Sequence, residues 1–528
     1  MNEKLYLKQN ILAEPLINQW YAWSHLVSPA TASMYIANSH LKIMRSFVSN
    51  PQVHISALKN PAMIGGPFIN HPTSRVDEIK SLMETTIKEQ ANMLEMAEAI
   101  RTLDETLKNE AEGYSLEPLY QKIPPALRGY VELVYDLNNN PSIRFIEGLL
   151  YNSPYYNRAA QGVSLSLAER DDRSFVFSTP RLDDEQHLHL NIPFCDERLD
   201  ELFRAKDVAG HLGYMKDVLN IRDKDDELFS SFFTNEPPSA RSNYTGDNVR
   251  IRYFGHACVL IESANTSILL DPLISYKIGG EIARYTFADL PETINYILIT
   301  HNHQDHCMFE TLLQLRHKTD NVIVPRSNSG ALADPSLKLT LQKIGFKNVR
   351  EIDEMETIGL TDGAITSLPF FGEHADLNIR TKTSYLVMLK GKSTLFVADS
   401  NNLLAGIYDH VHEITGDLDV MFLGMECDGA PMSWLYGPLL TQPLARKMDQ
   451  SRRFDGSDFE KALDIMKAFN PKQVYVYAMG QEPWLTYLTS IQYTEASRPI
   501  VESNKLVEEC VKRGLVSERL YGRKEIPL

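Results

Sequence analysis

Residues 296–306 read YILITHNHQDH, and this stretch decides the fold. Its first half is a short apolar run of the kind that forms a buried strand. Its second half places a group of metal-ligand side chains directly after that strand. Such a group is costly to bury unless a cation occupies the space between the side chains. The pattern therefore predicts a metal site at a strand end, with four expected ligands, His301, His303, Asp305 and His306.

The spacing of the motif leaves room for two metal ions. In extended or turning backbone, His301 and His303 point the same way and can both reach one ion. Asp305 and His306 follow as the chain turns toward a helix predicted at residues 308–316, and they can hold a second ion nearby. We therefore expect a dinuclear site.

The surrounding sequence alternates between strands and helices. Short apolar runs separated by turn residues predict strands at 249–253, 258–262, 267–270, 321–324, 384–389 and 393–397. Helical stretches lie between the later runs, as at residues 409–413. Strands that alternate with helices indicate a layered α/β arrangement.

The chain of 528 residues is long enough for two domains. Residues 235–248 (NEPPSARSNYTGDN) are rich in Pro, Ser, Asn and Gly and predict a linker. We place the boundary there, which gives an N-terminal domain over 1–245 and a metal-binding domain over 246–528. In the first domain, residues 76–109 predict an amphipathic helix or helix pair, and 174–177 and 187–190 predict strands. This half is therefore expected to be α+β.

Composition excludes several classes of partner. The formal net charge of −16 disfavours binding to nucleic acid, which needs clustered Lys and Arg. No apolar run approaches the roughly 20 residues that span a bilayer, and the N-terminus lacks the apolar core of a signal peptide. The five cysteines form no C-x-x-C pair and suit a reducing compartment. We expect a cytoplasmic protein with neither nucleic acid nor membrane as a partner.

Three motifs together, Gly255-His256, Asp271-Pro272 and residues 300–306, resemble the metallo-β-lactamase superfamily. The resemblance implies an αββα sandwich in the C-terminal half, with metals held between the two sheets. Most hydrolases of that superfamily add a further His, a bridging Asp and a last His. Here Glu373, predicted at a strand end, takes the place of the further His, Asp399 matches the bridging Asp, and no histidine follows His412.

The resulting donor set of three imidazoles and three carboxylates bears on the choice of metal. Zinc accepts such ligands, but oxygen-rich sites with histidines and open positions are typical of iron and manganese. Carboxylates that can shift between terminal and bridging modes suit a metal that changes oxidation state. The sequence therefore favours diiron oxygen chemistry over hydrolysis.

A closer resemblance covers essentially the whole chain. Residues 18–23, 28–32, 37–42 and 476–484 are similar to the diiron β-hydroxylases of nonribosomal peptide pathways, which serve antibiotic biosynthesis. Membership of that family implies a monooxygenase that inserts one atom of O₂ at the β-carbon of an amino acid. The amino acid is held as a thioester on a peptide-synthetase carrier domain.

The same resemblance implies roles for individual residues and partners. His301, His303 and Glu373 would hold one iron, Asp305 and His306 the other, and Asp399 would be shared. The N-terminal domain would form a homodimer and shape the channel for the carrier-borne substrate. The chain shows no dinucleotide motif, flavin motif or cysteine cluster, so the electrons would come from a separate reductase.

Two other functions remain open at this point. One is a zinc- or manganese-dependent hydrolase of the same fold, and the other is a carrier-binding scaffold with a vestigial site. His256 is expected to support the ligands as a donor, and Glu426 either supports the site or lies at the core edge. His374 is a weaker candidate for contact with substrate or ligand. Four tryptophans are either core or pocket residues: Trp20, Trp23, Trp434 and Trp484. Four basic residues form either a carrier-docking patch or a solvated helix end: Arg446, Lys447, Arg452 and Arg453.

Overall fold

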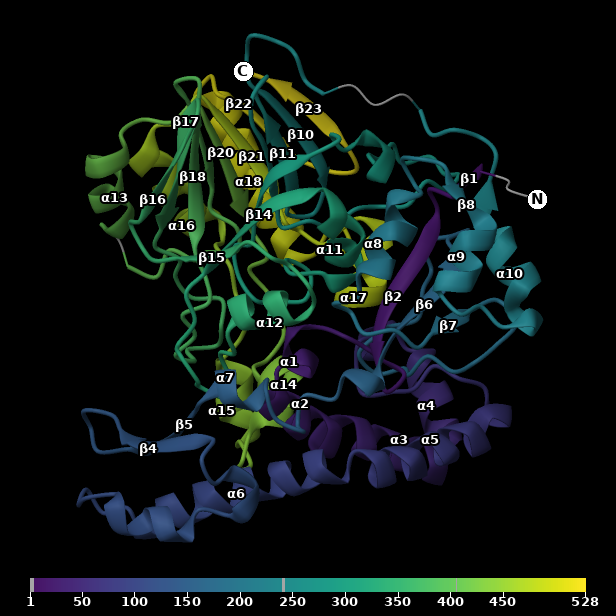
Figure 1. Ribbon diagram of the computed structural model, residues 1–528. Helices are drawn as coiled ribbons and strands as arrows, with labels where there is room; N and C mark the ends of the chain where they lie inside the picture. The colour runs from purple at the N-terminus through teal and green to yellow at the C-terminus, as the bar shows by residue number, and fades with distance from the viewer. Residues whose placement is uncertain (1–3, 240–242, 405) are drawn as a thin grey trace.

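The computed structural model describes residues 4–239, 243–404 and 406–528 (Figure 1). In its C-terminal half, two seven-stranded sheets face each other. The first has the order β15-β14-β13-β12-β11-β10-β23 and the second β16-β17-β18-β19-β20-β21-β22. β10, β11 and β12 are antiparallel and β12 to β15 parallel, while β23 adds antiparallel to β10.

The first sheet contains β10 Arg250–Gly255, β11 Cys258–Glu262, β12 Ser267–Leu270, β13 Ile294–Leu298, β14 Thr319–Pro325, β15 Val349–Ile352 and β23 Lys524–Pro527. The second contains β16 Thr357–Leu360, β17 Gly363–Leu368, β18 Ser384–Leu389, β19 Lys392–Phe396, β20 Val420–Gly424, β21 Gln473–Tyr477 and β22 Val516–Arg519. The strands predicted from apolar runs in this half are confirmed, with ends that shift by at most two residues where they differ.

Apolar side chains fill the space between the two sheets. Val259 and Leu298 of the first sheet share one buried cluster with Tyr385 and Phe396 of the second. Residues that alternate along a strand point to opposite faces, so each sheet also buries its outer face under helices. Helices α13, α16 and α18 pack in one cluster with the second sheet, and α11 and α12 pack with the first. This arrangement confirms the expected αββα sandwich.

The helices of this half are α11 Phe309–Leu315, α12 Leu337–Lys343, α13 Ile407–Thr415, α14 Ser433–Tyr436, α15 Arg446–Ser451, α16 Phe459–Phe469, α17 Thr486–Thr489 and α18 Arg498–Lys512. Within the described ranges, no helix of the chain combines the length and apolarity needed to cross a bilayer.

The N-terminal half is α+β, as expected, and it packs onto the first sheet. A four-stranded sheet, β3-β2-β6-β7, lies beside α8 and α11 in Figure 1, and both α8 and β2 contact α11. One hydrophobic cluster runs through both halves, so that Leu12 and Val163 share a core with Leu269 and Leu312. The N-terminal half therefore covers the face of the sandwich next to the metal loop.

The N-terminal strands are β1 Lys4–Leu7, β2 Ile11–Ile17, β3 Trp20–Tyr21, β4 Val131–Tyr135, β5 Pro141–Phe145, β6 Gln161–Leu167, β7 Leu188–Leu190, β8 Gly210–His211 and β9 Phe233–Thr234. The helices are α1 Ser24–Val27, α2 Pro29–Tyr35, the π-helix Ile36–His40, α3 Leu41–Ser49, α4 Pro51–Leu58, α5 Val76–Glu89, α6 Ala91–Glu110, α7 Glu147–Leu150, α8 Glu197–Arg204, α9 Leu212–Val218 and α10 Asp226–Ser231.

Two predictions in this half have different outcomes. Residues 76–109 form a helix pair, because Gln90 leaves the helical region (φ −106°, ψ 24°) between α5 and α6. The strand predicted at 174–177 is wrong, since these residues pair with no strand and form a loop. The loop is fixed instead by the Val176 N–H, which donates to Tyr487 O at 3.0 Å, and by ring contacts of Phe175 and Phe177.

Candidate metal centre

The predicted metal motif lies in the loop between β13 and α11. His301 and His306 are fully buried and His303 is nearly so, while Asp305 keeps a small exposed fraction. The His306 N–H donates to His303 O at 3.2 Å, which closes a turn and brings the four side chains to one side. Thr383 N donates to Thr300 O at 2.7 Å and ties this loop to the second sheet.

The two distant carboxylates reach the same place from the second sheet. Asp399 follows β19, as predicted. We expected Glu373 at a strand end, and this prediction is wrong. Glu373 lies within the loop that follows β17. Its backbone is left-handed (φ 63°), as are those of Ala375 (φ 52°) and Asp376 (φ 57°), and this conformation turns the loop back toward the metal motif.

The six predicted ligands form overlapping groups. His303 Nδ1 lies 2.8 Å from Glu373 Oε1, and His301 Nε2 lies 4.0 Å from Glu373 Oε2. Asp399 Oδ2 is 3.0 Å from His306 Nε2 and 3.8 Å from His301 Nε2. Ligand atoms of His301, His303 and Glu373 form one group that could hold a metal ion, and those of His301, His306 and Asp399 form another. Asp399 therefore lies where a carboxylate could bridge two ions.

Several atoms of this centre have no hydrogen-bond partner among the described residues. Among them are the buried atoms His301 Nε2, His303 Nε2 and Asp399 Oδ1. Each such atom costs roughly 1–3 kcal/mol when it is removed from water unpaired. A bound cation would satisfy them, so the donor set of three imidazoles and three carboxylates fits a pair of iron ions.

Asp271 fixes the orientation of the metal motif through its contacts with His306 and Thr300. Its Oδ2 lies 2.9 Å from His306 Nδ1 and accepts the Thr300 hydroxyl at 2.6 Å, and its Oδ1 accepts the Thr300 N–H at 2.7 Å. With its Nδ1 bonded to a carboxylate, His306 keeps Nε2 available for a metal ion. Such carboxylate–histidine pairs also raise the basicity of the ligand.

His256 contacts the centre through Asp305. The Gly480 N–H donates to His256 Nδ1 at 3.2 Å, so a neutral His256 carries its proton on Nε2. That nitrogen lies 3.3 Å from Asp305 Oδ2. The atoms of His256, Asp305 and His306 are also close enough to form a metal-binding group, but the bond from Gly480 favours the predicted supporting role of His256.

Burial and nearby charge set the protonation of the carboxylates. Burial alone would raise the pKa of Glu373, but His303 and His374 outweigh it and lower the pKa to about 2. The pKa of Asp305 is likewise held well below its usual range, because the hydrogen bond from His256 and the surrounding imidazoles outweigh burial. Burial, together with Asp399 and Asp305, raises the pKa of Glu426 well above its usual range. Glu426 therefore lies close enough to the centre to feel its charges.

The remaining sequence candidates fall in different places. His374 Nδ1 lies 2.9 Å from Glu373 Oε2. In the basic cluster, Arg452 donates to Ala375 O at 2.8 Å and Arg453 lies 3.5 Å from Asp428, while Arg446 and Lys447 are exposed. Of the tryptophans, Trp20, Trp23 and Trp434 line one cavity and Trp484 lies elsewhere.

Sequence reasoning missed a buried ionic cluster between the two halves. Arg173 forms a paired contact with Glu310, with distances of 3.0 and 2.8 Å, and also contacts Glu14. Arg181 donates to Glu14 at 2.6 Å. Tyr21 and Tyr276 donate to Glu310 at 3.0 and 2.5 Å. The one available signal was Glu310 itself, a carboxylate in α11, where every side chain is buried.

Comparison with known proteins gives consistent matches over both halves. Residues 6–237 match the family described as diiron non-heme β-hydroxylase N-terminal domain, and residues 250–422 match the β-lactamase superfamily domain. The chain is 39% identical over 531 aligned residues to the 4-amino-L-phenylalanyl-[CmlP-peptidyl-carrier-protein] 3-hydroxylase of Streptomyces venezuelae, and the alignment covers 99% of each chain.

Solved structures agree with the sequence matches. The crystal structure of CmlA, a diiron β-hydroxylase from Streptomyces venezuelae, superposes with a TM-score of 0.94 at 39% identity over 100% of both chains. A mutant form of the CmlA β-hydroxylase superposes with a TM-score of 0.91 at 38% identity, over 99% of this chain and 100% of the other. The whole chain, sandwich and N-terminal half together, belongs to the CmlA-like family of diiron β-hydroxylases.

Proposed function

We propose that this protein is an O₂-dependent monooxygenase that hydroxylates the β-carbon of an aminoacyl group held as a thioester on a peptide-synthetase carrier domain. The observation that carries the proposal is the position of the buried His301, whose Nε2 lies 4.0 Å from Glu373 Oε2 and 3.8 Å from Asp399 Oδ2, in a chain with no histidine after His412. The relative from Streptomyces venezuelae, whose name states a carrier-bound aminoacyl substrate, supports the substrate class.

The two irons would divide the six ligands between them. His301, His303 and Glu373 would hold one iron, Asp305 and His306 the other, with Asp399 shared. When bound, the pair supplies the activation of O₂. Overall, one C–H bond, O₂, two electrons and two protons give one C–OH group and one water. The electrons would come from a separate reductase, which remains part of this proposal.

The chain itself contributes orientation and exclusion of water. Asp271 holds His306 in the tautomer that leaves Nε2 free for metal, and His256 holds Asp305. Because the imidazoles are buried, the reacting centre would be dry, and electrostatic interactions there are stronger than in water. A dry centre also prevents side reactions of the activated oxygen.

The first test is metal content and redox response. We expect about two irons per chain, with an optical spectrum that changes on anaerobic reduction and again on exposure to O₂. Glu373→Ala and Asp399→Ala should each lower bound iron and abolish hydroxylation while the fold is kept. Glu413→Ala, which removes an exposed carboxylate of α13, is the matched control and should keep both.

Two results would contradict the proposal. Full iron and full turnover in either ligand variant would show that the ligand assignment is wrong. Stoichiometric zinc with no redox response, persisting after reconstitution with iron, would favour a hydrolase of the same fold. A carrier thioester should also be a far better substrate than the free amino acid, and equal rates would remove the carrier from the proposal.

Three further features belong to this proposal. The division into domains 1–245 and 246–528 is supported by the separate matches over 6–237 and 250–422. A homodimer is supported by the family resemblance and by an arm of α6 and the β4–β5 hairpin, which extends from the body in Figure 1 and exposes Tyr114 and Leu137. A cytoplasmic location is supported by five free cysteines.

A further inference from the structure

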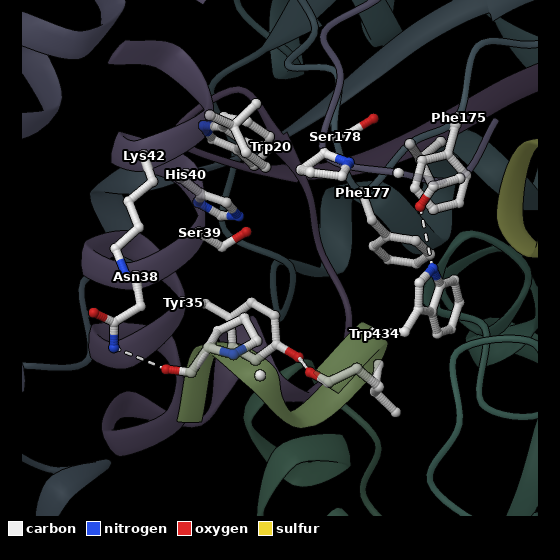
Figure 2. Close-up of a pocket in the computed structure, with 18 of the residues that line it drawn as sticks. Trp20, Tyr35, Asn38, Ser39, His40, Lys42, Phe175, Phe177, Ser178 and Trp434 are labelled. Atoms are coloured by element: carbon white, nitrogen blue, oxygen red, sulfur yellow. Dashed lines mark hydrogen bonds between the residues drawn. The ribbon is translucent and has the colours of Figure 1, made fainter. Parts of the chain in front are cut away.

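A cavity of about 660 Å³ lies between the N-terminal helices and the metal loop. Several aromatic rings line it, among them Trp20, Tyr35, Phe175, Phe177 and Trp434 (Figure 2). Its volume is in the usual range for a site that takes a small organic ligand. The α14 segment closes one side, where Tyr35 Oη bonds to Leu435 O and Trp434 Nε1 donates to Gly65 O at 3.1 Å.

The inner end of the cavity touches the metal motif. Gln304, between the proposed ligands His303 and Asp305, lines the cavity and is 6% exposed. Its Oε1 has no hydrogen-bond partner among the described residues, and neither has Nε1 of Trp20, which is 1% exposed and lines the same cavity. A buried acceptor and a buried donor are thus left for a ligand with both kinds of group.

The cavity lining also includes a cation. Lys42 lines the cavity from α3, is exposed, and forms no ion pair within the described part of the chain. Figure 2 shows Lys42 and Asn38 on one side of the cavity and Phe175 and Trp434 on the other. Just before Lys42 the helix widens into the π-helix Ile36–His40, a distortion that is frequent at functional sites.

These features describe a ligand that is anionic at one end, apolar in its body and amide-bearing along its length. We propose that the cavity binds the phosphopantetheine arm of the carrier domain, with the phosphate at Lys42 and the thioester end at Gln304. Amide groups of the arm would accept from Trp20 Nε1 and donate to Gln304 Oε1. This inference rests on the proposed function, because the arm is the part of a carrier that delivers the aminoacyl group.

Intrinsic fluorescence gives a direct readout, because three of the four tryptophans line this cavity. The probes are S-methyl phosphopantetheine and S-methyl pantetheine, whose methylated sulfur cannot bind metal as a thiolate. They are titrated into the iron-loaded protein, into Lys42→Glu and into Arg45→Glu. Arg45 is the matched control, since it is an exposed cation of the same helix that does not line the cavity.

We expect saturable quenching by both probes, with tighter binding of the phosphorylated one. Lys42→Glu should weaken phosphopantetheine about tenfold, in line with the loss of a charge-assisted contact, and leave pantetheine within about twofold. Arg45→Glu should change neither. Absence of saturable binding, or equal sensitivity of both probes to Lys42→Glu, would overturn the arm placement.

Hydroxylation assays separate this inference from the proposed function. If an aminoacyl carrier is hydroxylated but its KM is the same in Lys42→Glu as in the starting protein, the function stands and the arm placement is wrong. If the probes bind as expected and no aminoacyl carrier is hydroxylated, the cavity still binds the arm and the proposed reaction fails.

Discussion

The metal centre and the ionic cluster between the two halves are both sets of buried charged side chains, but only the ionic cluster is complete in charge by itself. Around Arg173, two arginines meet two glutamates, and tyrosines satisfy further carboxylate oxygens. At the metal centre, His301 Nε2 and Asp399 Oδ1 have no partner among the described residues. The charges of the first cluster balance one another, although Arg173 Nε has no hydrogen-bond partner among the described residues. The second cluster is balanced only when cations are added.

The comparison shows how one fold uses buried charge for two purposes. A buried ion pair with good geometry gives about the same folding stability as apolar residues of similar volume, but removing one partner lowers that stability strongly. An incomplete set of ligands instead links folding to metal binding. The two regions also meet in one helix, because α11 begins just after the metal motif and carries Glu310.

The largest effect should come from breaking the complete cluster. Arg173→Met leaves the buried Glu14 and Glu310 without a shared cation, so the free energy of unfolding should fall by about 3–5 kcal/mol. Urea denaturation measures this, and iron content per chain should not change. Arg170→Met, at a side chain that is 79% exposed, is the control and should cost no more than about 1 kcal/mol. A similarly small loss for Arg173→Met would mean that water already screens the cluster.

Metal loading tests the incomplete cluster. At a free iron concentration about a thousandfold above Kd, loading should raise the free energy of unfolding by about 4 kcal/mol. The measurement is anaerobic denaturation with and without ferrous iron. Asp399→Asn should lose most of this gain, while its iron-free form should be about as stable as the iron-free starting protein. A large loss of stability in iron-free Asp399→Asn would show that the centre is already satisfied without metal.

A smaller effect is expected from the carboxylate behind the motif. Asp271→Asn removes the charge that orients His306, so iron affinity should fall about 10–100-fold. Competition with a chelator measures the affinity. Asp362→Asn is the matched control, because Asp362 also accepts a threonine hydroxyl, from Thr266 at 2.7 Å, but is not among the grouped metal-ligand residues. Equal losses in both variants would argue against a specific role for Asp271.

The smallest effect is a pH dependence of the complete cluster. Burial alone would raise the pKa of Glu14, but Arg181 and Arg173 outweigh it and hold the pKa well below its usual range. A depressed folded-state pKa gives stability that is present above the unfolded pKa of about 4.3 and is lost as pH falls. Between pH 7 and pH 4, Glu14 should therefore account for a loss of less than about 1 kcal/mol. The contribution of Glu14 is the difference between the free energy of unfolding of the starting protein and that of Glu14→Gln, each measured against pH. Identical pH curves for the two proteins would contradict the assignment.

Local patterns in the sequence predicted much of this molecule. His301 to His306 could be proposed as ligands because their side chains are neighbours along the chain and follow a strand. Asp399 could be placed because it also follows a strand and matches a known motif. Glu373 was found by resemblance, but its loop conformation was not, because a left-handed run of non-glycine residues has no clear sequence signal.

Features that depend on contacts between residues far apart in the chain could not be predicted from the sequence. Phe175 and Phe177 have the composition of a strand, but they pair with no strand among the described residues, and their rings pack at the cavity instead. Glu14, Arg173 and Glu310 lie far apart in sequence and form an ionic cluster only after the two halves have packed. Gln304 looked like a spacer between ligands, and only the folded chain shows that it lines a cavity.

The pairing of β23 with β10 has a consequence for the order of events on the ribosome. At roughly 5–20 residues per second, about ten to forty seconds pass between the synthesis of His306 and that of β23. During that interval one edge of the first sheet stays open, and for part of it Asp399 does not yet exist. A nascent chain can thus expose the histidine motif long before it can hold two ions, which makes metal loading a late step of maturation.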